Sequence, residues 1–314
     1  MSSPLLLIML VLATGVLGYA LKRAGFCMVD VVLQAYRRGV YGKALALWLT
    51  VMVILMGHLL LVILTGASSW PTYALSGTSL LGGALLGVGA GLNRGCNIST
   101  FTKLAEGRTE MLATITGWGL GGLLMAAMGA ALPVPQAGGS HKALLISGVG
   151  LGGVCGYAYW MWRRVPANKR FGLLAGFRHA RGMIWLIGPS AALVTVFLPD
   201  WGTIGSFFTL SITQPAYLLS TSSMYGLSLA VLFTGMLVAS WHMRRFALRG
   251  APLRVWGRHL FAGLLMGMGA YGIPGGSDTL LFIGLPALSP HAPGAIVMMA
   301  LGIWGVERLR AQRT

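Results

Sequence analysis

Long apolar stretches alternate with short polar loops along almost the whole chain. A helix needs roughly 20 apolar residues to cross a bilayer, and fewer where the helix is broken. Candidate spans of that kind are residues 4–22, 43–65, 75–92, 109–132, 143–162, 182–199, 216–242, 259–273 and 291–307. The pattern therefore predicts an all-α integral membrane protein with about nine transmembrane helices.

Four shorter apolar pieces lie between these candidate spans. They are residues 25–35, 96–105, 203–213 and 277–287. Each is too short to cross a bilayer and too apolar to be an ordinary solvent loop. We therefore expect four short re-entrant helices that return to the side of the membrane from which they start.

The composition agrees with a membrane protein and argues against several other classes. The 314 residues are 56% hydrophobic and 9% charged, with a formal net charge of +17. Because the basic residues are scattered between apolar spans, they are better read as topology signals than as a nucleic-acid patch. The three cysteines form no CxxC or His/Cys cluster, so neither a disulfide framework, a metal site nor a cofactor is indicated. The apolar run 4–21 lacks a basic region before it and predicts a retained helix instead of a cleaved signal peptide.

The basic residues also predict which side of the membrane each loop occupies. If the N-terminus is outside and the short pieces are re-entrant, all but Lys142 of the 23 Lys and Arg residues are cytoplasmic. Such an asymmetry is the expected signature of the inner loops of a membrane protein. We therefore expect a multi-pass protein of the cell (inner) membrane with a cytoplasmic C-terminus.

The same topology predicts two halves of opposite orientation within a single polytopic membrane domain. The pseudo-repeats are residues 4–132 and 182–309, joined by a connector helix at 143–162 and a basic cytoplasmic loop at 163–181. The stretch GVGAGLNRGCNISTFTK, beginning at Gly87, has a partner 180 residues later in GMGAYGIPGGSDT. Paired broken helices in inverted halves point to the substrate site of a transporter.

Two cysteines stand where the chain enters short helices of the first half. Cys27 lies in GFCMVD and Cys96 in NRGCN. A helix N-terminus offers free N–H groups and activates a thiol, although cysteine is also a small residue that buries well. Their equivalent placement favours a functional role for both, whereas Cys155, mid-span in GGVCGY, is expected to be structural.

Neutral polar side chains surround both helix breaks. The candidate path residues beside the two cysteines are Asn93, Arg94, Asn97, Ser99, Ser277 and Thr279. Neutral donors suit a polar solute that must leave again, although helix capping is the ordinary role of such residues. Arg94 is interpreted as an anion-attracting charge at the inner mouth and Asp278 as a helix cap. We expect His58, the one histidine clearly inside a predicted span, to be packed and neutral.

These motifs resemble those of a known group of membrane proteins. GFCMVD, GVGAGLNRGCN followed by ISTF, and GIPGGSDTLLFIGLPALSPHA are similar to segments of the YeeE/YedE family of sulfur-transport proteins. The resemblance implies nine spans and four short helices around a narrow path for thiosulfate or a related sulfur species, lined by Cys27 and Cys96. It also implies a third path cysteine in the second half, where this chain has Gly276. Some members work beside a soluble sulfur-carrier protein.

The sequence thus predicts a transporter, not an enzyme, for a small sulfur-containing anion, most simply thiosulfate. It has no Walker, GxSxG or HExxH motif to support a hydrolase site. Two alternatives remain open. The same fold could carry another sulfur, selenium or inorganic anion, or the chain could be a non-transporting membrane subunit of a sulfur-relay or redox complex.

Overall fold

The structure is a computed structural model that describes residues 4–65, 71–130, 133, 177–199, 201–204 and 222–312. The regular elements within these ranges are helical. In chain order they are α1 (Pro4–Ala24), α2 (Met28–Arg38), α3 (Gly42–Thr65), α4 (Gly77–Asn93), α5 (Asn97–Leu104), α6 (Met111–Ala127), α9 (Phe177–Phe197), α11 (Ser222–His242), α12 (Leu253–Gly272), α13 (Ser277–Thr279), the π-helical turn η2 (Leu280–Gly284) and α14 (His291–Ala311). Every predicted span except 143–162 corresponds to one of the long helices. The connector, residues 163–176 of the basic loop and residues 205–213 of the third short piece lie outside the described residues.

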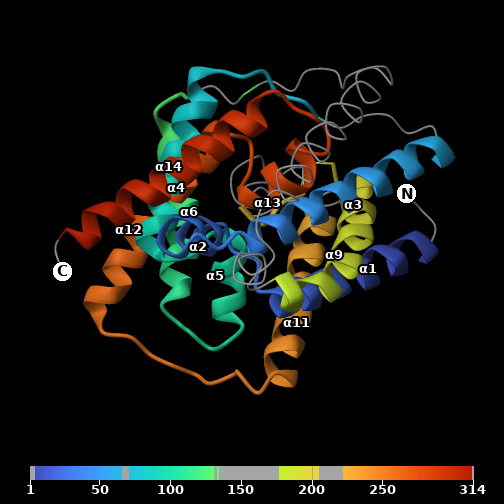
Figure 1. Ribbon diagram of the computed structural model, residues 1–314, viewed down its shortest axis with the longest axis horizontal. Coiled ribbons are helices and arrows are strands. Elements are labelled where there is room, and N and C mark those ends of the chain that lie inside the picture. Colours follow the sequence, from blue (N-terminus) through green and yellow to red (C-terminus); the bar gives the residue numbers. More distant parts are fainter. Residues whose placement is uncertain are drawn as a thin grey trace.

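The long helices form two groups, with the short elements between them (Figure 1). One group contains α1, α3, α9 and α11, and the other contains α4, α6, α12 and α14. Helix α2 contacts α3 in the first group and α14 in the second. Helix α5 likewise contacts α11 and α6, and η2 contacts α3, α9 and α14. The short elements therefore lie at the junction of the two groups.

The contacts among the long helices keep the same pattern when each helix is replaced by its counterpart in the other half of the chain. If α1, α3, α4 and α6 are paired with α9, α11, α12 and α14, the α1–α11 contact becomes the α9–α3 contact. The α6–α12 contact becomes α14–α4, and the α1–α9 and α4–α12 contacts map onto themselves. Each group is therefore built from two helices of each half.

Close backbone approach at glycines holds the helices of the second group together. A Cβ atom added at Gly82 would lie 2.7 Å from the carbonyl oxygen of Gly269, and one added at Gly269 would lie 2.5 Å from that of Gly82. Small residues at helix interfaces allow this approach in membranes, where apolar burial between helices gives little driving force. Gly82 and Gly269 lie at the contact of α4 with α12, the contact that maps onto itself when the two halves are exchanged.

The chain is a multi-pass membrane protein. Segments Leu5–Arg38, Gly42–Leu60, Met224–His242 and His291–Ala311 are long and apolar enough to cross a membrane. Helices α2, with 11 residues, and α5, with 8, are not. At about 1.5 Å per residue they reach roughly 16 and 12 Å, about half or less of the hydrocarbon thickness.

Basic helix ends gather at one end of the molecule and interact there. Lys22 at the end of α1 bonds to Glu106 after α5 at 2.6 Å, and Arg37 at the end of α2 pairs with Glu307 near the end of α14. The Arg310 guanidinium group donates to the carbonyl oxygen of Leu92 at 3.2 Å. These contacts bring to one end the loops that the charge pattern assigns to the cytoplasm.

Candidate functional site

The N-terminal ends of four short helical segments lie close together between the two helix groups. Cys27 directly precedes α2, Cys96 precedes α5, Gly276 precedes α13, and Thr203 lies in a short helical segment after α9. All four residues except Gly276 carry a buried side chain. Helix starts leave their first N–H groups without partners inside the helix, so the convergence concentrates hydrogen-bond donors at this point.

Local backbone geometry explains why the helices break at these points. Helix α4 ends because Arg94 adopts a left-handed conformation with φ 55°, after which the Gly95 N–H donates to the Ala90 carbonyl oxygen at 3.0 Å. Gly275, whose φ is 133°, makes the equivalent bond to Ala270 at 2.9 Å. The two breaks aligned in the sequence thus share this hydrogen bond, although the positive φ falls on Arg94 in the first and on Gly275, the counterpart of Gly95, in the second.

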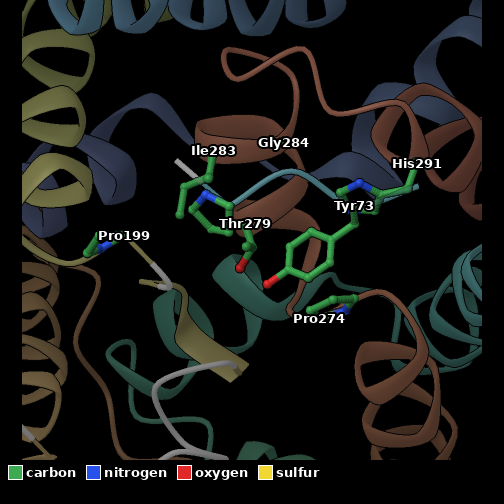
Figure 2. Close-up of a pocket in the computed structure, with 8 residues that line it drawn as sticks. Tyr73, Pro199, Pro274, Thr279, Ile283, Gly284 and His291 are labelled. Carbon is green, nitrogen blue, oxygen red and sulfur yellow. The ribbon is translucent and has the colours of Figure 1, made fainter. Parts of the chain in front are cut away.

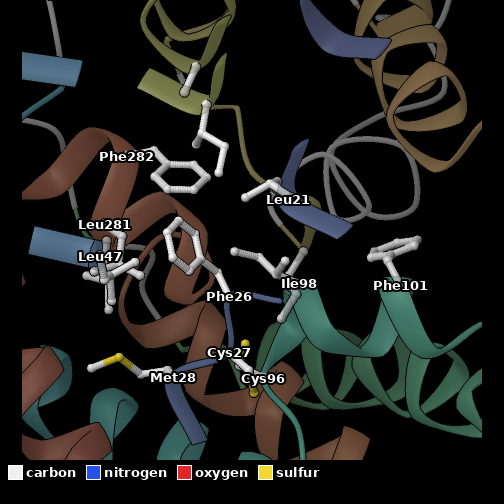
Figure 3. Close-up of a cluster of buried hydrophobic side chains, with 14 of the residues drawn as sticks. Leu21, Phe26, Cys27, Met28, Leu47, Cys96, Ile98, Phe101, Leu281 and Phe282 are labelled. Atoms are coloured by element: carbon white, nitrogen blue, oxygen red, sulfur yellow. The ribbon is translucent and has the colours of Figure 1, made fainter. Parts of the chain in front are cut away.

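The structure brings Cys27 and Cys96 side by side. The two thiols interact with each other, and both side chains are buried as free cysteines. Figure 3 shows the two sulfur atoms at the edge of an apolar cluster that includes Phe26 and Ile98. The two cysteines come from the first half alone, from segments about 70 residues apart in the chain.

Donors from both short helices face the two sulfur atoms. The Cys96 sulfur interacts with the backbone of Met28 and Ser99, and the Cys27 sulfur interacts with the backbone of Cys96 and the side chain of Ser99. Ser99 Oγ also lies 3.0 Å from the Cys96 carbonyl oxygen, to which it donates. The predicted path residue Ser99 therefore belongs to the thiol pair, and the pair can present several weak donors to a sulfur-containing solute.

A buried polar cluster joins Asn97 of the first half to Ser277 of the second. Asn97 Oδ1 accepts hydrogen bonds from the Ser277 hydroxyl and, at 3.2 Å, from its N–H. Asn97 Nδ2 donates to Thr203 Oγ1 at 2.8 Å and to the Asp278 carboxylate. Asn97 and Ser277 occupy equivalent positions of the two repeats, so the repeats meet at this bond.

The sequence predicted that Asp278 caps its own helix, but Gly276 is the N-cap of α13 and the Asp278 oxygens bond to other segments. Its Oδ2 atom accepts from the N–H of Thr203 at 2.5 Å, and its Oδ1 atom accepts from Asn97. The side chain is 1% exposed. Asp278 therefore fastens α13 to the starts of two other short segments, a role that sequence reasoning did not assign.

Asn93 and Arg94 lie in different environments although they are adjacent in the chain. Asn93 is buried, its Oδ1 atom accepts from Thr114 Oγ1 at 2.8 Å, and it lies 2.6 Å from His259 Nδ1. Arg94 is exposed, and its carbonyl oxygen accepts from the Lys103 ammonium group at 2.6 Å. Asn93 thus ties α4 to α6 and α12, while Arg94 is the path candidate nearest to solvent at the basic end.

Thr279 lines a pocket on the opposite side of the polar cluster. The pocket is small, with a cavity volume of about 10 Å³, and is lined by Pro71, Tyr73, Pro199, Pro274, Thr279, Ile283, Gly284 and His291. Figure 2 shows the Tyr73 and Thr279 hydroxyl groups directed toward the same space. His291 stacks edge-on against Tyr73, with ring centroids 5.2 Å apart. No pattern in the sequence identified the proline, tyrosine and histidine residues of this pocket as candidates for function.

The comparison with known families agrees with this geometry. Residues 23–305 match the family described as sulphur transport. The chain belongs to the sulphur transport family. No curated protein is significantly similar to it. The match spans both helix breaks and all the path candidates, which supports the YeeE/YedE resemblance of the motifs.

The structure also explains why this member of the sulphur transport family has glycine at position 276. A Cβ atom there would lie 2.4 Å from Asn97 Nδ2 and 2.7 Å from Asp278 Oδ1. The amide and the carboxylate thus occupy the space that a cysteine side chain would need. At the position where the resemblance implied a third cysteine, the structure has this polar cluster.

Other intramembrane candidates lie away from the convergence of short helices. His58 Nε2 lies 2.5 Å from Thr195 Oγ1 at the contact of α3 with α9. Glu110 pairs with Arg108 at 3.2 Å. His58 lies inside the candidate span Gly42–Leu60, as expected, whereas the buried His259 of α12 was not singled out from the sequence. Cys155 lies outside the described residues.

Proposed function

We propose that this protein is a permease that carries thiosulfate along a narrow path between the two helix groups. The proposal rests on the contact between the Cys27 and Cys96 thiols at the starts of two short helices, in a chain of the sulphur transport family. No covalent change of the solute is needed, so the protein acts as a carrier and not as an enzyme.

The path begins at the pocket lined by Tyr73 and Thr279 and ends at Arg94. Between them lie the Asn97–Ser277 bond and then the two thiols. This order follows the chain, because Ser277 is two residues from Thr279 and Asn97 directly follows Cys96. The basic end faces the cytoplasm under the positive-inside rule, which makes the pocket the outer mouth. The exchange of helix contacts between halves supports an inverted repeat with nine spans and four re-entrant helices.

Weak contacts suit the transported anion better than a fixed charge. Conduction requires binding that is strong enough for entry and weak enough for exit. N–H groups at the starts of α2 and α5 supply positive potential, and the thiols supply polarisable contacts to the terminal sulfur of the solute. Ser99, Ser277 and Thr279 add neutral hydroxyl groups along the same line.

The polar cluster at Gly276 favours one alternative cargo class. With glycine at this position the chain has one sulfur contact fewer, so an oxyanion of sulfur, selenium or another element is the alternative to thiosulfate. A role as a non-transporting subunit of a sulfur-relay complex has no comparable support from the site. A cytosolic sulfur-carrier protein could receive the cargo at the basic end.

Growth of a bacterium that lacks sulfate uptake tests the proposal. Expression of the protein should restore growth on limiting thiosulfate, and Cys27→Ala and Cys96→Ala should each cut uptake about tenfold, since one lost contact costs about 1–2 kcal/mol. Cys155→Ala is the matched control and should leave uptake nearly unchanged. Absence of rescue by the inserted wild-type protein would contradict the assignment of thiosulfate, and growth on limiting sulfate or a new sensitivity to selenite instead would identify the alternative cargo.

A further inference from the structure

We propose that Asp278 binds the proton that couples anion uptake to the proton gradient, and that its ionised form keeps the path closed. The inference rests on the proposed transport of an anion and adds a driving force to it. Asp278 and Ser277 stand between Thr279, which lines the outer pocket, and Asn97, which directly follows Cys96. Any solute that moves from the pocket to the thiols therefore passes this carboxyl group.

The contacts of Asp278 form a latch across the path. Its two oxygens accept from Thr203 N and Asn97 Nδ2, which belong to two different short segments. Asn97 is in turn bonded to Ser277 and to the Thr203 hydroxyl. Three segment starts are thus held together by one carboxylate, and an ionised carboxylate is the stronger acceptor for these bonds.

No opposite charge neutralises this carboxylate in the described part of the chain. The salt bridges there involve Asp30, Glu106, Glu110 and Glu307, but not Asp278. The titratable side chains described on the elements packed against α13 and η2 are Lys103 of α5, Lys43 and His58 of α3, and His291, Glu307, Arg308 and Arg310 of α14, with Cys96 directly before α5. Among these, Lys103 bonds to the Arg94 carbonyl oxygen instead. The repeat-equivalent residue of Asp278 is Ile98, so the fold of the repeat does not itself require a carboxyl group.

A proton fits this site better than a metal cation. Packing around the carboxylate is so close that even one Cβ atom at Gly276 would overlap Asn97 and Asp278. A Cβ atom at Gly202 would similarly lie 2.0 Å from Thr279 Oγ1. A cation with several oxygen ligands needs space of its own, whereas a proton adds none. Intramembrane carboxyl groups of this kind are recurrent members of proton relays in pumps and transporters.

The proposed cycle moves one proton with each anion. A proton from the outer side binds an Asp278 oxygen and forms a neutral carboxylic acid, which has lost one acceptor site and its negative charge. The bonds to Thr203 and Asn97 weaken, the segment starts separate, and the anion passes without repulsion from a carboxylate. The acid then loses its proton to the cytoplasmic side, and the regenerated carboxylate closes the latch. The co-transported positive charge also lowers the electrical work of bringing an anion into a negative interior.

Purified protein in proteoliposomes with an internal pH-sensitive dye tests this cycle. Adding thiosulfate outside wild-type vesicles should acidify the interior, and one unit of inward proton gradient should raise the accumulation ratio by up to about tenfold for one proton per anion. Asp278→Asn should lose this response and still exchange internal for external labelled thiosulfate. The double variant Asn97→Asp, Asp278→Asn returns a carboxyl group to the cluster and should regain the response.

The outcomes separate the proton role of Asp278 from the proposed transport of thiosulfate. Thiosulfate entry into wild-type vesicles without internal acidification would overturn the proton role, whatever the variants do. Retained coupling in Asp278→Asn, or a response to a sodium gradient in place of a proton gradient, would also overturn it. Failure of wild-type vesicles to exchange thiosulfate at all would instead contradict the proposed function.

Discussion

One methyl group added at Gly276 should disrupt the centre of the protein. In Gly276→Ala the new Cβ atom would stand 2.4 Å from Asn97 Nδ2, well inside ordinary contact distance. The backbone there has φ −104° and ψ −170°, which alanine adopts freely, so space alone decides the outcome. Asn97 must move, and its bond to the Asp278 carboxylate is lost. A hydrogen bond to a charged group contributes about 1.5–3 kcal/mol, so a loss of about 2–3 kcal/mol is expected.

Thermal unfolding of the purified protein in detergent measures this loss. The midpoint should fall by roughly 5–10 °C, from the usual few degrees per kcal/mol in chains of this size. Gly77→Ala is the matched control, because Gly77 also stands at a helix start and has nothing within 4 Å of an added Cβ. In an Asn97→Ala background, Gly276→Ala should cost far less, since its partner is already gone. Equal stability of Gly276→Ala and wild type would refute the close packing of the cluster.

Three further substitutions test separate parts of the account. Gly302→Ala should lower stability by about 1–3 kcal/mol in the same unfolding assay, because its Cβ would lie 2.7 Å from the backbone of α4. Gly305→Ala on the same helix is the control and should be neutral, because an added Cβ there meets open space. Asn93→Leu should destabilise the protein by about 1–3 kcal/mol because His259 loses its partner, and retained stability in chemical unfolding would contradict that role. Tyr73→Phe should raise the KM for thiosulfate several-fold at unchanged kcat, and an unchanged KM would remove the outer pocket from the path.

The sequence was most informative where one local signal decides the backbone. The breaks at Arg94–Gly95 and Gly275 depend on residues whose conformations end a helix, and the 180-residue offset between the two glycine-rich stretches pairs them. A functional role for both Cys27 and Cys96 was expected on similar grounds, since both precede short helices of one half, but their direct contact was not. Length and hydropathy were enough to predict the helices, because the bilayer sets their size.

The sequence was least informative where distant segments meet. Asp278 bonds to Thr203, 75 residues earlier, and to Asn97, 181 residues earlier, and no local pattern reveals such a partner. A capping role for Asp278 was the natural local reading because aspartate often caps helices. The resemblance implied a cysteine where the chain has Gly276, but the reason for the glycine depends on atoms of Asn97 in the other half. His259 was missed because a single histidine on an apolar helix carries no signal of what it faces.

The flux of labelled thiosulfate into proteoliposomes containing only the purified protein tests the central claim most directly. Wild-type vesicles should show saturable uptake at least about ten times that of protein-free vesicles. The double variant Cys27→Ala, Cys96→Ala, inserted to the same level, should fall close to the protein-free rate, because both sulfur contacts and their interaction with each other are gone. Uptake by the double variant at the wild-type rate would show that the two thiols are packing groups and that the path lies elsewhere.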